Sequence, residues 1–203
     1  ANNAMQVFEK LGLRKIIEEN GNTISSLNIT KPNLKSLSKV DLSYFEEKFN
    51  VKNTAIHRGV LQQILVDKLS PSSFILNHKL NKLTKNPTGY SLEFQNGKTI
   101  HSSTLIGADG LNSVVRQNLF PNNTIRNAKQ ICWRGITEYN LPQKYRHELN
   151  EAWGKSDRFG FVQIGNNKVY WYALKTFKEN KEEFNVNNID SYFNKYNRVV
   201  QEI

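Results

Sequence analysis

The chain has 203 residues, enough for one large domain or two small ones with a core that needs no disulfide staples. Its hydrophobic share of 38% and its mixed charges are typical of a globular protein and exclude a disordered one. No apolar run approaches the roughly 20 residues that cross a bilayer, and no signal-peptide pattern opens the chain. Because the single cysteine, Cys132, cannot form an internal disulfide, we expect a reducing, cytoplasmic location.

The net charge of +10 would suit a nucleic-acid partner if the charge were concentrated. The lysines, however, are spread along the whole chain, and no basic stripe is interleaved with stacking aromatics. We therefore predict a solvated, lysine-rich surface and no nucleic-acid binding. A basic, non-catalytic binding module remains the alternative from another class, and salt-dependent retention on DNA would support it.

The first quarter of the chain combines a helix with strands. Apolar residues at helical spacing predict a helix over residues 5–11, which Gly12 ends because glycine is favoured where a chain leaves helical geometry. Alternation predicts a strand over residues 24–30 and a further strand or bent segment over residues 34–42. We interpret residues 23–49 as an excursion into a second layer.

A firmer helix is predicted over residues 57–69, where an apolar stripe recurs at helical spacing and Ser70-Pro71 stops it. Arg58 and Gln62 are four residues apart and so lie on one face of this helix. Arg58 falls in the first turn, where the positive helix end favours an anion. The alternative is that both are solvent-facing surface residues.

A β-meander is predicted next. Its strands are expected, after a short strand over residues 74–76, at residues 79–84, 90–94 and 98–101. Turns are expected at residues 86–89 and 95–98, and the pair Asn96-Gly97 indicates a type I′ hairpin.

Residues 103–116 have the pattern of a strand, a tight turn and a helix. An apolar run ends at Ile106, the turn follows at Gly107–Gly110, and apolar residues recur at helical spacing from Asn112 to Phe120. Glycines permit positive φ and let a ligand approach the backbone. Amides freed at the start of the helix would bind an anion, most often phosphate, near Asp109 and Arg116. An ordinary strand-to-helix turn is the alternative.

The remainder is rich in aromatic residues. Strands are predicted over residues 131–136, 158–164 and 168–174, with a tight turn at 165–167, and a helix over residues 190–203. Alternation gives each strand two faces, one on the core and one that could line a cavity, although any single aromatic residue here is more simply explained as core. The four histidines have no metal-site spacing, and no nucleophile elbow or Walker loop is present.

Together these stretches resemble the FAD-dependent aromatic-ring monooxygenases, the para-hydroxybenzoate hydroxylase-like flavoproteins. The turn Gly107-Ala-Asp-Gly110, followed by Ser113, Val115 and Arg116, is similar to the family signature GADG-x-x-S-x-V-R. The helix that begins near Arg58 resembles the family's Arg-x-x-Leu-x-x-x-Leu helix, whose arginine contacts FAD. The segments Trp133-Arg-Gly, Arg158-Phe-Gly-Phe and Tyr170-Trp-Tyr-Ala resemble the substrate-domain sheet of the zeaxanthin epoxidase and urate hydroxylase-like branch.

The resemblance implies an α/β fold. A partial Rossmann-like FAD-binding domain, residues 1–22 and 50–124, would be interleaved with a mostly antiparallel β-sheet substrate domain, residues 23–49 and 125–203. NAD(P)H would reduce the FAD, molecular oxygen would add to the reduced flavin, and the resulting hydroperoxide would hydroxylate or epoxidise a small organic substrate, aromatic or polyene.

The resemblance also assigns residues. The implied FAD contacts are Arg58, Gln62, Gly107, Ala108, Asp109, Gly110 and Arg116. The residues named for the substrate pocket are Arg134, Phe161, Tyr170 and Tyr172. The chemistry belongs to the cofactor, so no catalytic side chain and no metal ligand are named.

Two motifs of the family are missing from these 203 residues: the Gly-x-Gly-x-x-Gly of a first strand and a later Gly-Asp motif. We therefore expect an internal fragment that binds FAD weakly or not at all and is inactive alone. The nearest alternative function is a flavin-dependent dehydrogenase or reductase that shares the GADG element. Oxygen consumption matched to hydroxylation or epoxidation would separate the two.

Overall fold

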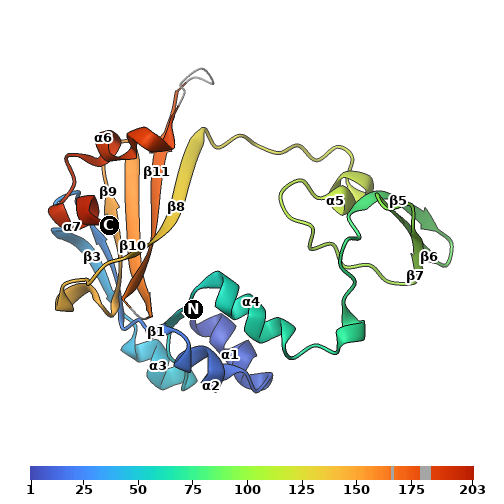
Figure 1. Ribbon diagram of the computed structural model, residues 1–203, viewed down its shortest axis with the longest axis horizontal. Helices are drawn as coiled ribbons and strands as arrows, with labels where there is room; N and C mark the ends of the chain where they lie inside the picture. The colour runs from blue at the N-terminus through green and yellow to red at the C-terminus, as the bar shows by residue number, and fades with distance from the viewer. Residues whose placement is uncertain (166, 179–183) are drawn as a thin grey trace. The chain divides into compact units, whose positions relative to one another are not determined.

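The computed structural model describes residues 1–165, 167–178 and 184–203, which form two compact units. Unit 1 contains residues 1–68 and 128–203, and unit 2 contains residues 69–127. Both units mix helices and sheets, so the predicted α/β class is confirmed (Figure 1). Among the described residues, no helix is long and apolar enough to cross a membrane.

Unit 1 is built on a six-stranded sheet with the strand order β3-β2-β9-β10-β11-β8. In that order the strands are Ser36–Asp41, Ser26–Thr30, Glu148–Trp153, Asp157–Gly165, Lys168–Thr176 and Gln130–Glu138. All neighbours are antiparallel except β2 and β9, which are parallel. The mostly antiparallel sheet of the substrate-domain prediction is therefore present, and β9, which the sequence pattern did not reveal, lies in its middle.

One face of this sheet carries the main core. The helices α6 (Ile189–Phe193) and α7 (Arg198–Glu202) cover it, as Figure 1 shows. Core residues on this face alternate along the strands and meet aromatic residues of the helices: Ala152, Phe159, Phe161, Val169, Ala173, Phe193, Tyr196 and Val200. Since every second residue of a strand points to the same side, the residues between them face the opposite side.

A helical cluster lies at one end of the sheet. Three helices, α1 (Asn2–Lys10), α2 (Arg14–Glu19) and α4 (Arg58–Val66), pack together through Met5, Leu13, Ile17, Val51 and Ile64. A two-stranded sheet of β1 (Asn22–Thr23) and β4 (Thr54–Ala55) joins this cluster to the larger sheet, and α3 (Ser43–Phe49) follows the edge strand β3.

Unit 2 is a three-stranded meander with one short helix. Its elements are the 3₁₀ turn η1 (Pro71–Ser73), β5 (Leu80–Asn86), β6 (Gly89–Phe94), β7 (Thr99–Ser102) and α5 (Val114–Leu119). The helix packs on the sheet through Val115, which meets Leu83 and Leu92 in a small core. The predicted meander is confirmed.

Two backbone predictions have different outcomes. Gly12 ends the first helix with φ of +67°, as expected of a glycine that leaves helical geometry. The type I′ turn at Asn96-Gly97 is wrong, because that turn needs positive φ at both residues and among these two only Gly97 has it, at +79°. The chain instead closes a turn from Phe94 to Gly97, with Gly97 N–H bonded to Phe94 O.

The strands expected at residues 74–76 and 103–106 do not form. A strand exists only where its backbone pairs with a neighbour, and the three strands of unit 2 pair among themselves. Most apolar side chains of these two segments are exposed, with Leu76 at 72% and Ile106 at 86%, whereas Leu105 packs against the small core of unit 2.

The helix expected over residues 190–203 is broken into α6 and α7. Asn197 caps α7, because its side-chain oxygen accepts a hydrogen bond from the N–H of Val199. Tyr196, just before the cap, is buried and donates its hydroxyl hydrogen bond to Asp157. A straight helix would draw these two groups away from their partners.

The compact units cut the chain at different places from the predicted domains. The assignment of residues 1–22 and 50–124 to FAD binding, and of 23–49 and 125–203 to substrate binding, concerns function rather than compactness. It stays a prediction.

Candidate functional site

A hollow of about 620 Å³ lies in unit 1, between the start of α4 and the sheet face opposite α6 and α7. Its lining is mainly aliphatic and aromatic, with two guanidinium groups: Thr54, Ala55, Ile56, His57, Arg58, Arg134, Gly135, Ile136, Val162, Ile164 and Tyr170. An apolar hollow with a few convergent polar groups is the usual form of a small-molecule site.

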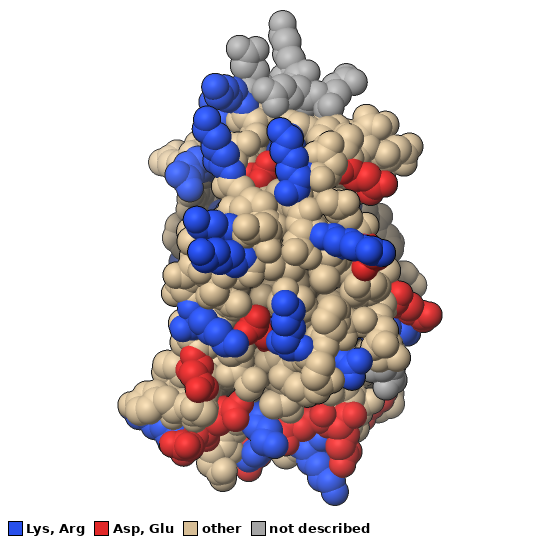
Figure 2. Space-filling model, turned by 90° about the vertical axis from the view of Figure 1, so that its left-hand side faces the viewer, with Lys and Arg blue, Asp and Glu red and all other residues tan. Residues whose placement is uncertain are grey.

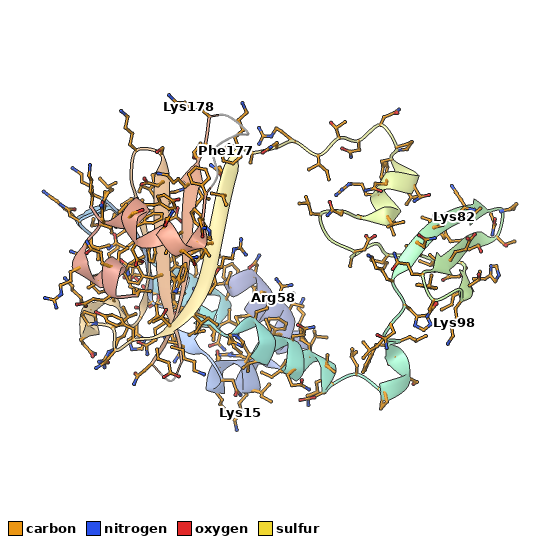
Figure 3. All side chains as sticks on the ribbon, turned by 45° about the horizontal axis from the view of Figure 1, so that its top comes forward. Lys15, Arg58, Lys82, Lys98, Phe177 and Lys178 are labelled. Atoms are coloured by element: carbon orange, nitrogen blue, oxygen red, sulfur yellow. The ribbon has the colours of Figure 1, made fainter. Side chains whose placement is uncertain are left out.

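Arg58 stands at the first position of α4, beside the sheet of unit 1 (Figure 3). The preceding residue, His57, makes no side-chain cap hydrogen bond, so the backbone amides of the first turn are not capped by it. Arg58 is exposed, and within the described part of the chain it makes no hydrogen bond or ion pair. The helix end and the guanidinium together provide a positive environment for an anionic group.

Gln62 lies one turn further along α4 and is exposed. It shares a face with Arg58, as predicted from the spacing. It does not line the hollow. Its assignment as an FAD contact stays a prediction.

Three of the four residues named for the substrate pocket share the hollow's face of the sheet. Arg134 pairs with Tyr172 across β8 and β11, and Ile136 pairs with Tyr170. Arg134 and Tyr170 line the hollow, while the Tyr172 ring lies beside that of Tyr170 with 6.4 Å between centroids.

Phe161 is on the other face and does not line this hollow, so its assignment to the substrate pocket stays a prediction that the hollow does not support. It is 1% exposed and packs edge-to-face on Tyr145, with 5.7 Å between ring centroids. Phe161 pairs with Trp171 of β11, whereas Val162 pairs with Tyr170. The side chain next in sequence, Val162, therefore lines the hollow in its place.

The turn Gly107–Gly110 belongs to unit 2 and is closed on itself by Asp109. One carboxylate oxygen accepts from the Ser113 hydroxyl at 2.5 Å, and the other from the N–H groups of Val114 and Val115. Ser113 in turn caps α5 by accepting from the N–H of Arg116 at 2.9 Å. The Ser113 hydrogen bond and those of the amides lower the pKa of Asp109, outweighing its partial desolvation.

The expectation of freed amides at this helix start is therefore wrong for Val114, Val115 and Arg116, because Asp109 and Ser113 already bind them. Arg116 is engaged as well, since its guanidinium donates to the backbone oxygen of Leu111. Gly110 has φ of +79°, and a Cβ there would meet nothing within 4 Å, so its backbone is open to a ligand. Gly107 instead lies against Val115: a Cβ added to Gly107 would be only 2.8 Å from the Val115 side chain.

We predict that Ser113→Ala loosens this turn. Loss of the cap costs about 1 kcal/mol of local stability, because the amide of Arg116 and the Asp109 carboxylate both lose a partner. Hydrogen exchange of the amides of α5 should therefore accelerate about fivefold. Ser91→Ala in β6 of the same unit serves as the control and should leave the exchange of α5 unchanged.

Sequence reasoning missed the aliphatic residues that complete the hollow: Ile136, Val162 and Ile164. The signal was available, because Ile136 is two residues from Arg134 on a strand, and Val162 and Ile164 alternate with Phe161. The alternation of residues along a strand does not, however, indicate which of the two sheet faces lines the hollow.

The described residues contain no group of three or more metal-ligating side chains that could hold an ion. On the face that Figure 2 shows, Lys and Arg are spread from top to bottom, and Asp and Glu are more numerous towards its lower end. This distribution agrees with a solvated surface. The absence of nucleic-acid binding stays a prediction.

No protein-family model matches the chain. Among curated proteins, it is 30% identical over 177 residues to aurachin C monooxygenase/isomerase of Stigmatella aurantiaca, covering 87% of this chain and 46% of that protein. It is also 30% identical over 131 residues to 2-heptyl-3-hydroxy-4(1H)-quinolone synthase of Pseudomonas aeruginosa, covering 64% of this chain and 34% of that protein. The chain thus spans less than half the length of these relatives.

Among solved structures, HpxO of Klebsiella pneumoniae, in complex with FAD and uric acid, superposes with a TM-score of 0.84. The match covers 99% of this chain and 53% of that one at 17% sequence identity. At this identity the match demonstrates a shared fold.

Proposed function

We propose that the protein carrying this chain is an FAD-dependent monooxygenase, because the chain is related in sequence and fold to enzymes of that class. Since the chain spans less than half the length of the relatives, the activity is proposed for the whole protein. The observation that carries the proposal is the apolar hollow between Arg58 and Arg134.

The residues of the hollow fit a flavin. Its aliphatic and aromatic walls suit a flat ring system, and Arg58 at the open start of α4 suits the anionic part of the cofactor. In unit 2, the open backbone at Gly110 fits a ligand that approaches closely, while Asp109 shapes the turn from within. We infer that Arg58, Gln62, the residues of the turn Gly107–Gly110 and Arg116 bind FAD.

When bound, FAD reduced by NAD(P)H supplies the activation of molecular oxygen. The chain's own residues orient the substrate and exclude water. Arg134 and Tyr170 offer polar contacts to a ligand in the hollow, and Ile136, Val162 and Ile164 keep water from its floor. A small organic substrate with an aromatic or polyene body fits these walls. The single cysteine supports a cytoplasmic location for the protein.

The first test of the proposal is Arg58→Ala in the full-length gene product. Losing a charge-assisted contact to an anionic group should weaken FAD binding about tenfold or more, measured by flavin absorbance during titration. Lys15→Ala is the matched control, because Lys15 belongs to the same unit and 89% of its side chain is exposed (Figure 3). Unchanged FAD affinity in Arg58→Ala would remove Arg58 from the site.

A second measurement addresses the reaction itself. With NAD(P)H and FAD supplied, oxygen consumption should match the amount of hydroxylated or epoxidised product. Reduction of an organic acceptor without oxygen uptake would replace the proposal by the dehydrogenase alternative.

A further inference from the structure

A carboxylate on the hollow's face of the sheet is surrounded by three hydrogen-bond donors. Glu151 of β9 accepts from the Tyr172 hydroxyl, from the indole N–H of Trp153 at 2.7 Å and from the Arg158 guanidinium at 3.3 Å. These residues share the hollow's face of the sheet, because Glu151, Gly160 and Tyr172 are paired across β9, β10 and β11. Only 21% of the Glu151 side chain is exposed.

The contact between Glu151 and Tyr172 spans a whole strand and depends on a glycine. The Tyr172 ring lies over Gly160 of β10, where a Cβ would be 2.2 Å from the ring atoms Cε1 and Cζ. Any side chain at this position would lift the ring from the sheet. Gly160 therefore lets a tyrosine of β11 reach a carboxylate of β9.

The hydrogen bond has one possible direction when the carboxylate is ionised, because such a carboxylate only accepts. The single phenolic proton of Tyr172 therefore points at Glu151, and the phenolic oxygen keeps only its lone pairs for another partner. Burial, and then the bond to Glu151, raise the pKa of Tyr172, while Arg158 opposes the shift. Tyr170 and Arg134 are the other titratable groups beside Tyr172 on this face.

We propose that Glu151 is a positioning residue of the substrate site, which holds Tyr172 as a hydrogen-bond acceptor and so selects ligands that carry an N–H or O–H donor. This inference rests on the proposed function, because it takes the face of Tyr170 and Tyr172 as the wall of the substrate site. Neutral phenols and lactam-type rings have such a donor, whereas ethers of the same shape do not. A Tyr172 hydroxyl that offers only its lone pairs discriminates between them at this position, because an unmatched lone pair is costly in a desolvated site.

The test compares two probes, phenol and anisole, on the FAD-loaded full-length protein. Dissociation constants come from the change in flavin absorbance on titration. The wild type should bind phenol more tightly than anisole, and the ratio should fall about fivefold or more in Tyr172→Phe and in Glu151→Gln. Glu93→Gln is the matched control, since Glu93 is a strand carboxylate of unit 2 that is paired with an exposed lysine.

Gly160→Ala separates the two residues without removing either. It should lower the phenol-to-anisole preference to the level of Glu151→Gln. In alkaline titration, one more tyrosine should ionise at lower pH in Glu151→Gln than in the wild type. This additional ionisation should be absent when Tyr172→Phe is combined with Glu151→Gln. A merely structural Glu151 would alter stability but neither the preference nor this step.

The inference is overturned if Tyr172→Phe loses the preference while Glu151→Gln and Gly160→Ala keep it, or if the wild type shows no preference. Those results leave the proposed function intact as long as the protein binds FAD and consumes oxygen. If the full-length protein fails to bind FAD, the proposed function fails, and this inference fails with it.

Discussion

Replacing Phe161 by alanine should lower the free energy of unfolding by about 3–5 kcal/mol, because a fully buried ring is removed from a packed core. Phe161 is 1% exposed and belongs to the cluster beneath α6 and α7. The measurement is urea unfolding followed by tryptophan fluorescence. This signal reports unit 1, since all three tryptophans, Trp133, Trp153 and Trp171, lie there.

The matched control is Phe45→Ala, the same substitution at a ring of unit 1 that is 39% exposed. It should cost less than about 1 kcal/mol. Phe161→Leu should fall between the two variants, because leucine fills part of the cavity. The core assignment would be refuted by a Phe161→Ala protein that is as stable as the wild type but has altered ligand binding.

Replacing Glu148 by alanine should cost about 2–4 kcal/mol, because several buried or half-buried donors lose their acceptor at once. Glu148 is 4% exposed and accepts from Ser26 and Asn28 of β2, each at 3.0 Å. It also pairs with Lys39 of the edge strand β3. The carboxylate thus ties β3 to the sheet through β2, and its loss should expose an unpaired strand edge.

The same residue gives stability a dependence on pH. Burial by itself would raise the pKa of Glu148, but the hydrogen bonds from Lys39, Asn28 and Ser26 outweigh it and bring the pKa below its ordinary value of 4.5. A group whose pKa is lower in the folded protein stabilises the fold above that ordinary value. This contribution is lost as the pH falls through the lowered pKa.

Urea unfolding as a function of pH measures this contribution. The wild type should lose stability below about pH 4.5, and Glu148→Gln should lose that part of the dependence while keeping the shape of the side chain. Glu138→Gln, at an exposed position of β8, should leave the dependence unchanged. An acid transition identical in Glu148→Gln and wild type would contradict the assignment.

Several features of this protein follow from the sequence alone. Helical spacing predicted α4 with Arg58 in its first turn, and alternation predicted β8, β10 and β11, because these patterns arise from the local geometry of the backbone. Gly12 could be identified as a helix end for the same reason. The resemblance in the GADG stretch predicted the class of protein to which the chain is related.

The tertiary structure decided which face of each strand is functional. Alternation places Phe161 and Tyr172 on regular faces but does not say which face meets α6 and α7. The strand register pairs Phe161 with Trp171 and Gly160 with Tyr172. Only this register assigns Phe161 to the core and Tyr172 to the hollow's side of the sheet. The register depends on contacts between residues far apart in the chain, and the spacing of apolar residues within one strand does not predict those contacts.

The same reason explains the remaining differences. Residues 103–106 have the composition of a strand, but a strand needs a paired neighbour, and none of the described residues pairs with them. The spacing also did not reveal that the Asp109 carboxylate caps α5, because the turn folds it back onto amides that come after it. No sequence pattern indicated Glu151. Its proposed role arises only because Glu151 of β9 pairs with Gly160 of β10, which pairs with Tyr172 of β11.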